Sequence, residues 1–174
     1  MKSKHLAILA IAGLTVVSLG HQLNRSVVAD VVQPEAIAQV AATRHPAVYT
    51  ENGVALDGQD VVAYFTQSAV VEGSTAYSLQ WNGTTWLFSS AANRDLFAQN
   101  PRQYAPQYGG YCAKAAAGGV LATTIPTAWE VRGGKLYLNY SADAQREWQQ
   151  DTETKIIQAN ANWPGILDNE TLKR

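Results

Sequence analysis

Residues Trp81–Lys114 read WNGTTWLFSSAANRDLFAQNPRQYAPQYGGYCAK and carry the clearest structural signals of the sequence. The first of these signals is Asn82-Gly83, placed between two runs rich in aromatic and β-branched residues, Tyr77–Trp81 and Thr84–Phe88. A two-residue hairpin loop needs a positive φ at both positions, which Asn-Gly adopts readily. The pattern therefore predicts an antiparallel hairpin with its turn at Asn82-Gly83.

A short helix is expected directly after this hairpin. Ser89 or Ser90 can cap its N-terminus by accepting a hydrogen bond from a backbone N–H. The helix must end before Pro101, because the residue preceding a proline is driven out of the helical region. The residues expected to share its apolar face are Ala92, Leu96 and Phe97.

A strand pair leading into a helix that ends in Asn-Pro-x-x-Tyr, here Asn100–Tyr104, resembles the YHS domain, a small relative of the TRASH metal-binding modules. The resemblance runs from about residue 52 to 167, and it is strongest to exported YHS-domain proteins, some of whose relatives are selenoproteins. It implies a domain at residues 51–167.

The resemblance does not bring a metal site with it. TRASH-type modules carry cysteines in Asp-Pro-Val-Cys and Phe-Cys-Ser-x-x-Cys, and the resemblance places these cysteines at Ala63, Ser89 and Asn93. A structural zinc site closes with about four Cys or His ligands. From Ala47 onward the sequence has no histidine and one cysteine. We therefore predict no metal ligands and no cofactor.

The N-terminus has the pattern of an export signal. Lys2 and Lys4 precede an apolar run over residues 6–19, which is short for a membrane span. Small residues suggest cleavage near residue 20, 29 or 38, and retention as an anchor is the alternative. The expected division is a signal or anchor at 1–29, a tether at 30–50, the YHS-like domain at 51–167 and a tail at 168–174. A periplasmic or extracellular location follows, with membrane attachment only if the N-terminal segment is retained.

Charge argues against a nucleic-acid partner. Residues 39–174 carry ten Lys and Arg against twelve Asp and Glu, without a basic run. Nucleic-acid binding proteins usually present a concentrated basic surface. Cys112 is the only cysteine, so no disulfide within the chain can form.

Local patterns predict an α+β fold, with one small antiparallel sheet of two hairpins packed by a short helix, a central helical turn and a long C-terminal helix. Residues 61–65 are interpreted as a buried strand, and Asp57–Asp60 as a turn in which Asp60 bonds to nearby N–H groups. The second hairpin is expected at 128–140. The central helical turn is expected at 111–117.

A long helix is expected to begin after Ser141 and to end at Pro164-Gly165. Three- and four-residue spacing predicts one buried stripe along it. The residues of this stripe are Ala144, Trp148, Thr152, Ile156, Ala159 and Trp163.

Cys112 is the main candidate for chemistry. If a helix begins after Gly109-Gly110, its N-terminus and Lys114 would favour the thiolate form of Cys112. Burial as a small apolar residue is the alternative. The candidate ligand-binding residues are Tyr108, Gly109, Gly110, Tyr111, Cys112 and Lys114.

These features predict an exported binding or thiol-redox module centred on Cys112. The alternatives are a thiol-dependent oxidoreductase that acts on peroxides or disulfides, and a purely structural accessory domain of the envelope. The expected partner is a small ligand, a metal shared between chains or an envelope protein. A histidine-dependent catalytic site is excluded for the domain, because it lacks histidine beyond the tether.

Overall fold

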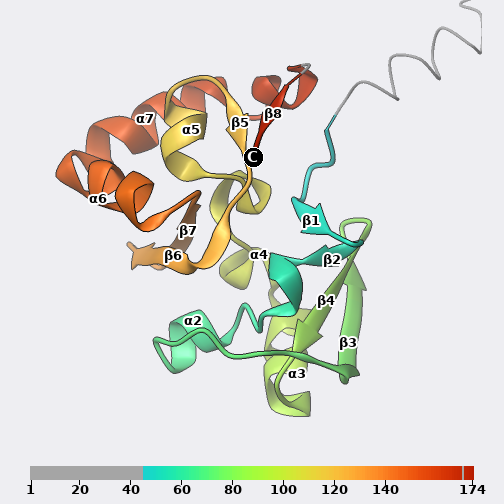
Figure 1. The fold of residues 1–174 in the computed structure, drawn as a ribbon. Coiled ribbons are helices and arrows are strands. Elements are labelled where there is room, and N and C mark those ends of the chain that lie inside the picture. The colour runs from blue at the N-terminus through green and yellow to red at the C-terminus, as the bar shows by residue number, and fades with distance from the viewer. Residues whose placement is uncertain (1–44, 170) are drawn as a thin grey trace, which may run out of the picture. The chain divides into compact units, whose positions relative to one another are not determined.

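The computed structural model describes residues 45–169 and 171–174, which belong to one compact unit, Pro34–Arg174 (Figure 1). The expected signal, its cleavage sites and most of the tether lie outside the described residues. Within the described part, no helix has both the length and the apolar character needed to cross a membrane. Helices and small sheets occur together, which confirms the α+β class.

The first sheet contains the predicted Asn-Gly hairpin. Its strands are β1 (Thr50–Glu51), β2 (Val54–Ala55), β3 (Ser74–Trp81) and β4 (Thr84–Phe88), in the order β1-β2-β4-β3. Asn82 and Gly83 have φ values of 51° and 75°, which confirms the turn. β2 runs parallel to β4, and the other pairs are antiparallel.

The second hairpin does not extend this sheet. β6 (Ile125–Arg132) and β7 (Lys135–Asn139) form a separate two-stranded sheet, so the prediction of one sheet made of both hairpins is wrong. A third sheet pairs β5 (Leu121–Ala122) with β8 (Leu172–Lys173) in parallel. Figure 1 shows β6 and β7 beside α6 (Ala142–Gln150), apart from β3 and β4.

β7 lies between two hydrophobic clusters, which explains the separation of the hairpins. Leu136 and Leu138 belong to a first cluster that includes Trp86 and Phe97. Tyr137, on the other face, belongs to a second cluster that includes Trp148. Both faces of β7 are therefore buried, whereas one open sheet would have left one face exposed.

The segment predicted as a buried strand at residues 61–65 is helical. Val61 and Val62 form a turn, and α2 (Ala63–Thr66) follows. The Asp60 carboxylate accepts hydrogen bonds from the backbone N–H groups of Val62 and Ala63 at 2.9 and 3.4 Å, and so holds them in a helical start. Periodicity cannot separate a helix from a strand in a short apolar run.

The next two helices are α3 (Ala91–Gln99) and α4 (Pro101–Tyr104). Ser90 caps α3, which stops before Pro101 as expected. Phe97 is buried, but Ala92 and Leu96 are exposed, so two of the three expected apolar contacts are wrong. Asn93 is the second buried residue of α3, because its amide bonds to Asp60.

Four short helical elements complete the fold. η1 (Leu56–Gly58) lies in the N-terminal part. In the C-terminal part, η2 (Gln107–Gly110) is followed by α5 (Ala113–Ala117), and η3 (Gly165–Asp168) lies close to the end of the chain. α5 is the predicted central helical turn, shortened by two residues at its start. Gly109 has a φ of 60°, and a side chain there would collide with the Ala47 carbonyl oxygen.

The expected long helix is divided into α6 (Ala142–Gln150) and α7 (Thr152–Asn162). Asp151 interrupts the helix with a non-helical backbone, and its carboxylate accepts a hydrogen bond from Thr154 N. The predicted stripe still faces inward. Ala144, Trp148, Thr152 and Ala159 are buried, while Ile156 and Trp163 are half-buried.

Candidate functional site

The three positions that the family resemblance assigns to metal-binding cysteines meet at the Asp60 carboxylate. Oδ2 of Asp60 accepts hydrogen bonds from Ser89 N at 2.8 Å, Ser89 Oγ at 2.6 Å and Asn93 Nδ2 at 2.6 Å. Oδ1 of Asp60 accepts a hydrogen bond from the backbone N–H of Ala63, which is the remaining one of the three positions. Asp60 is 0% exposed, so this centre is sealed from solvent.

A metal ion does not fit this centre. Ala63 offers no side-chain donor atom, and the side chains of Ser89 and Asn93 are already bonded to Asp60. Zinc and copper(I) sites need thiolate or imidazole ligands, which are missing here. In the described residues, no group of three or more His, Cys, Asp or Glu side chains is placed to hold a metal ion.

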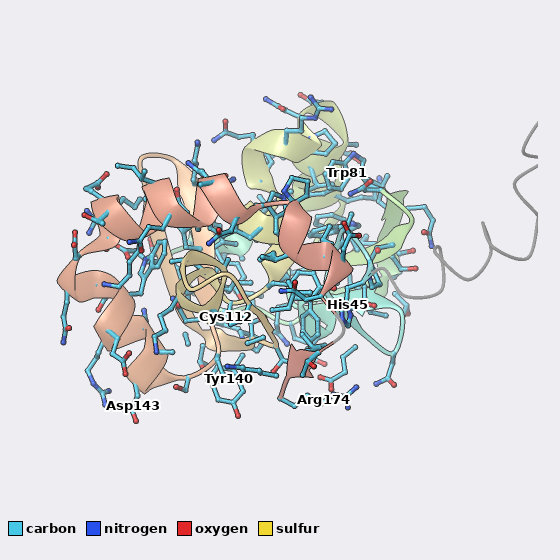
Figure 2. All side chains as sticks on the ribbon, turned by 90° about the horizontal axis from the view of Figure 1, so that it is seen from above. His45, Trp81, Cys112, Tyr140, Asp143 and Arg174 are labelled. Atoms are coloured by element: carbon cyan, nitrogen blue, oxygen red, sulfur yellow. The ribbon has the colours of Figure 1, made fainter. Side chains whose placement is uncertain are left out.

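Cys112 lies at the N-terminus of α5 but is nearly sealed. It is 1% exposed and occupies the capping position before Ala113. Its Sγ accepts a hydrogen bond from Tyr140 N at 3.3 Å and donates to Asn139 Oδ1 at 3.8 Å. Figure 2 shows Cys112 next to Tyr140 and well apart from Trp81.

Burial decides the acidity of this thiol. It raises the pKa of Cys112 above the ordinary value, although backbone N–H groups of Ala115, Tyr140 and Lys114 and the charge of Lys114 act in the opposite direction. The prediction of a lowered pKa is therefore wrong. The physical reason is that a low-dielectric surrounding disfavours the thiolate more than one short helix can favour it.

Asn139 adds an unusual feature to the Cys112 centre. Its side chain is 0% exposed, and its Oδ1 also accepts a hydrogen bond from Lys114 N at 3.2 Å. Its Nδ2 is buried without a hydrogen-bond partner among the described residues. An unpaired buried donor is rare and costs stability.

The structure divides the predicted ligand-binding residues among three pockets. Cys112 and Lys114 line one of about 490 Å³, while Tyr111 lines another of about 300 Å³. Tyr108 and Gly109 line a third of about 650 Å³. Gly110 is buried and lines none of these three.

The predicted residues also have partners within the protein. The hydroxyl of Tyr108 donates to Asn160 Oδ1, and that of Tyr111 donates to Pro46 O. Burial raises the pKa of Tyr111 to about 12 and that of Tyr108 further. Lys114 pairs with Glu147 at 2.7 Å. The structure therefore places only Cys112 and Lys114 of the predicted residues in one pocket and distributes the others elsewhere.

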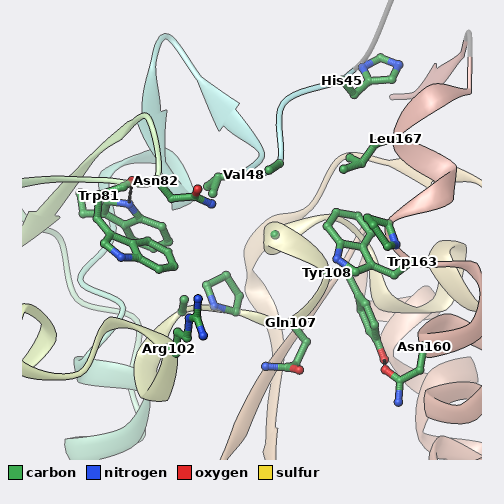
Figure 3. Close-up of a pocket in the computed structure, with 16 residues that line it drawn as sticks. His45, Val48, Trp81, Asn82, Arg102, Gln107, Tyr108, Asn160, Trp163 and Leu167 are labelled. Carbon is green, nitrogen blue, oxygen red and sulfur yellow. Dashed lines mark hydrogen bonds between the residues drawn. The ribbon is translucent and has the colours of Figure 1, made fainter.

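The largest of these pockets is lined by three tryptophans, Trp81, Trp86 and Trp163, and we call it the tryptophan pocket. Its other lining residues include Asn82, Arg102, Gln107 and Tyr108. Figure 3 shows Trp81 and Trp163 on opposite sides of the pocket. Its volume of about 650 Å³ is within the usual range for small-molecule sites.

Trp81 and Trp163, on opposite sides of the pocket, are held by aromatic packing. Trp81 meets the rings of Trp86 and Phe97 edge-on, with centroids 5.8 and 5.6 Å away. Trp163 packs against Tyr108 and Tyr111, each with centroids 6.1 Å away. Trp81 packs on the first hydrophobic cluster and Trp163 on the second, so the pocket lies along the junction of the two clusters.

Three polar side chains of the tryptophan pocket, those of Asn82, Arg102 and Gln107, have no partners among the described residues. The ion pairs in this part of the chain engage Arg94, Lys114, Arg132 and Arg146, but not Arg102. The side chains of Asn82 and Gln107 likewise make no hydrogen bond to a described residue. Hydrogen-bonding capacity is therefore available to a ligand.

Sequence reasoning did not find this pocket. Its walls come from the β3 end, α4, η2 and the end of α7, which are far apart along the chain. Trp163 was assigned to a packing stripe, and Arg102 to no role. The local sequence shows only that Trp81 precedes the turn at Asn82-Gly83 and that Trp163 precedes Pro164-Gly165. A tryptophan before a turn is not specific to a binding site.

Comparison with known proteins gives one match. Residues 62–108 match the model of the YHS domain family. No curated protein and no solved structure is detectably similar to the chain. The matched segment contains the Asp60-facing residues Ala63, Ser89 and Asn93 and ends at Tyr108, in the tryptophan pocket. The chain therefore contains a YHS domain, which covers residues 62–108.

Proposed function

We propose that this chain is a binding module rather than an enzyme, and that its ligand site is the tryptophan pocket. One observation carries the proposal. Two aromatic walls face each other across a pocket whose Arg102, Asn82 and Gln107 side chains have no partner among the described residues. A small set of free polar groups in an aromatic surrounding is typical of small-molecule sites.

The proposal moves the site away from Cys112, where the sequence had suggested it. Cys112 is 1% exposed, and burial raises the pKa of its thiol. The tryptophan pocket is open to solvent at Arg102 and Asn82. A ligand can reach this pocket without any rearrangement of the protein.

We further propose that the module acts outside the cytoplasm. This part rests on the basic and apolar pattern of residues 2–19 alone. Fractionation of cells that express the full chain, followed by N-terminal sequencing of the purified protein, tests it. Full-length protein found only in the cytoplasm would contradict it.

The binding proposal is tested by nuclear magnetic resonance of the tryptophan indole N–H groups. A small-molecule library added to the purified protein should shift the signals of Trp81 and Trp163. The signal of Trp148 should stay fixed, because its Nε1 donates to Glu130 Oε2 at 3.1 Å elsewhere in the protein. Compounds that shift all indole signals equally, or none at all, would contradict the proposal.

A pair of variants extends this test. Trp163→Ala removes one wall of the pocket, while Trp129→Ala removes a half-buried tryptophan that does not line it. Both lose aromatic packing, since Trp129 packs edge-on against Tyr64 at 5.1 Å. Binding should be lost in the first variant and kept in the second, provided that circular dichroism shows both to be folded.

A second candidate function is thiol redox chemistry at Cys112. It is supported by the backbone N–H groups of Tyr140, Lys114 and Ala115, which surround the sulfur. In this chemistry the thiolate would take one oxygen from a peroxide, releasing an alcohol or water, and two external thiols would reduce the sulfenic acid. Alkylation of native Cys112 at the rate of the unfolded chain, or faster, would favour it over the binding proposal.

A further inference from the structure

We propose that the tryptophan pocket selects a planar, aromatic ligand that carries a negative charge, with its acidic group bound to Arg102. This inference rests on the proposed function, because it names the class of ligand for the same pocket. It depends on three properties of the pocket, namely its charge, its free donors and its paired aromatic walls.

The charge of the pocket is one-sided. Arg102 lines it, and none of the described lining residues is Asp or Glu. No ion pair or hydrogen bond to a described residue engages the Arg102 side chain. A guanidinium is always charged and binds carboxylate or phosphate with two parallel N–H donors. An anion is therefore favoured over a cation.

The free donors extend this preference. Figure 3 shows Arg102 and Gln107 on the same side of the pocket, below Asn82. They lie between Trp81 and Trp163 in this view. The amides of Gln107 and Asn82 are free to donate N–H groups. Hydrogen bonds to a charged group contribute more than those to a neutral group, so an acidic ligand gains most from this arrangement.

The walls favour a flat ring system. Trp81 and Trp163 are half-buried, and Trp86 and Tyr108 add two further rings. The Tyr108 hydroxyl is already bonded to Asn160. Aromatic rings gain from stacked or edge-on contact with another ring beyond the area that they bury. A saturated molecule of equal size buries similar area but loses this contribution.

Four naphthalene-sized probes test the inference by isothermal titration calorimetry with the purified chain. 2-Naphthoate is flat and anionic, 2-naphthamide is flat and neutral, 2-naphthylmethylamine is flat and cationic, and decahydro-2-naphthoate is anionic without an aromatic ring. We expect 2-naphthoate to bind at least about tenfold more tightly than the neutral and cationic probes, because these lose a charged hydrogen bond. It should bind at least about threefold more tightly than decahydro-2-naphthoate, because the saturated acid loses the ring contacts.

The variant Arg102→Gln assigns the preference to one side chain. Arg102 is exposed on α4, so its replacement leaves the core intact. It should lower the affinity for 2-naphthoate about tenfold and leave that for 2-naphthamide unchanged. The matched control is Arg146→Gln, which removes an exposed arginine of α6 that pairs with Asp143 and should change neither affinity.

The outcomes separate the two proposals. Equal affinities for 2-naphthoate and 2-naphthamide, or an Arg102→Gln variant that keeps the preference, would overturn the ligand class and leave the binding function standing. Equal affinities for the aromatic and saturated acids would overturn the aromatic part. Binding of none of the four probes at millimolar concentration would overturn the ligand class, and the library experiment then decides the binding function alone.

Discussion

Two buried polar centres in this protein differ in how completely their hydrogen bonds are satisfied. At the first, Asp60 accepts five hydrogen bonds from Val62, Ala63, Ser89 and Asn93. At the second, Asn139 lies beside Cys112, and its buried Nδ2 has no partner in the part of the chain that the structure describes. The first centre is closed, whereas the second keeps an unused donor.

The difference lies in how many elements each centre joins. A metal ion joins its ligands from several elements, and here one carboxylate joins the start of α2 to the start of α3 through hydrogen bonds. The Cys112 centre has no comparable hub. The buried Asp60 carboxylate therefore stabilises the contact between two helices. The buried Asn139 amide accepts hydrogen bonds through Oδ1, but its Nδ2, without a partner among the described residues, lowers stability.

The largest expected effect is the loss of the Asp60 charge. Asp60→Asn exchanges an acceptor oxygen for an NH₂ group that faces the donors of Ser89 and Asn93. We expect the free energy of unfolding to fall by about 2–4 kcal/mol, because charged hydrogen bonds contribute about 1.5–3 kcal/mol each. Urea denaturation measures it. The matched control, Asp95→Asn on the exposed face of α3, should change little, and equal effects would contradict the comparison.

A pair of asparagine variants compares the centres directly. Asn93→Leu removes a donor that Asp60 uses, and should cost about 1–3 kcal/mol. Asn139→Leu removes an acceptor but also the unpaired Nδ2, so its net effect should stay within about 1 kcal/mol. Both residues are buried, which makes the pair matched. A larger loss for Asn139→Leu would show that its amide is satisfied in solution.

A smaller effect is expected from alkaline pH. The pKa values of Cys112 and Tyr111 are raised in the folded protein, the second to about 12. The unfolded chain therefore loses these protons first, and its proton count falls below that of the folded protein. Stability should be full below pH ~8.5 and decline as the pH rises through the raised pKa values.

Urea denaturation between pH 7 and 11 measures this decline. In the Cys112→Ala variant the decline should begin only near pH ~10, where unfolded tyrosines ionise. A decline that begins at the same pH in both proteins would show that the Cys112 thiol is not protected by burial.

The smallest expected effect is that of metal removal. Dialysis against EDTA should leave the melting temperature unchanged, because Ala63, Ser89 and Asn93 surround a carboxylate and supply no thiolate. Elemental analysis of the dialysed protein should find no stoichiometric zinc or copper. A lower melting temperature that zinc restores would mean that the Asp60 centre is not closed.

Local chemistry made much of the fold predictable. The turn at Asn82-Gly83, the cap at Ser90 and the stop at Pro101 depend on neighbouring residues, and all three are found. Trp148, a member of the predicted stripe, is buried as expected. The strand expected at residues 61–65 is wrong because a five-residue apolar run has no diagnostic period.

The candidate site was less predictable, because it depends on distant contacts. The capture of Ser89 and Asn93 by Asp60 joins residues about thirty positions apart, and Trp81 meets Trp163 only through the final packing. The sequence pattern around Cys112 indicated a helix start, which is present. It carried no information about the depth of burial, which reverses the expected pKa shift.

The position of β7 has a consequence for where this protein can be divided. The family match ends at residue 108, yet Leu136 and Leu138 complete the cluster that contains Trp86 and Phe97. A fragment limited to residues 62–108 would expose that cluster and should not be an autonomous folding unit. Because Tyr137 on the same strand anchors the other cluster, both halves should melt in a single cooperative step.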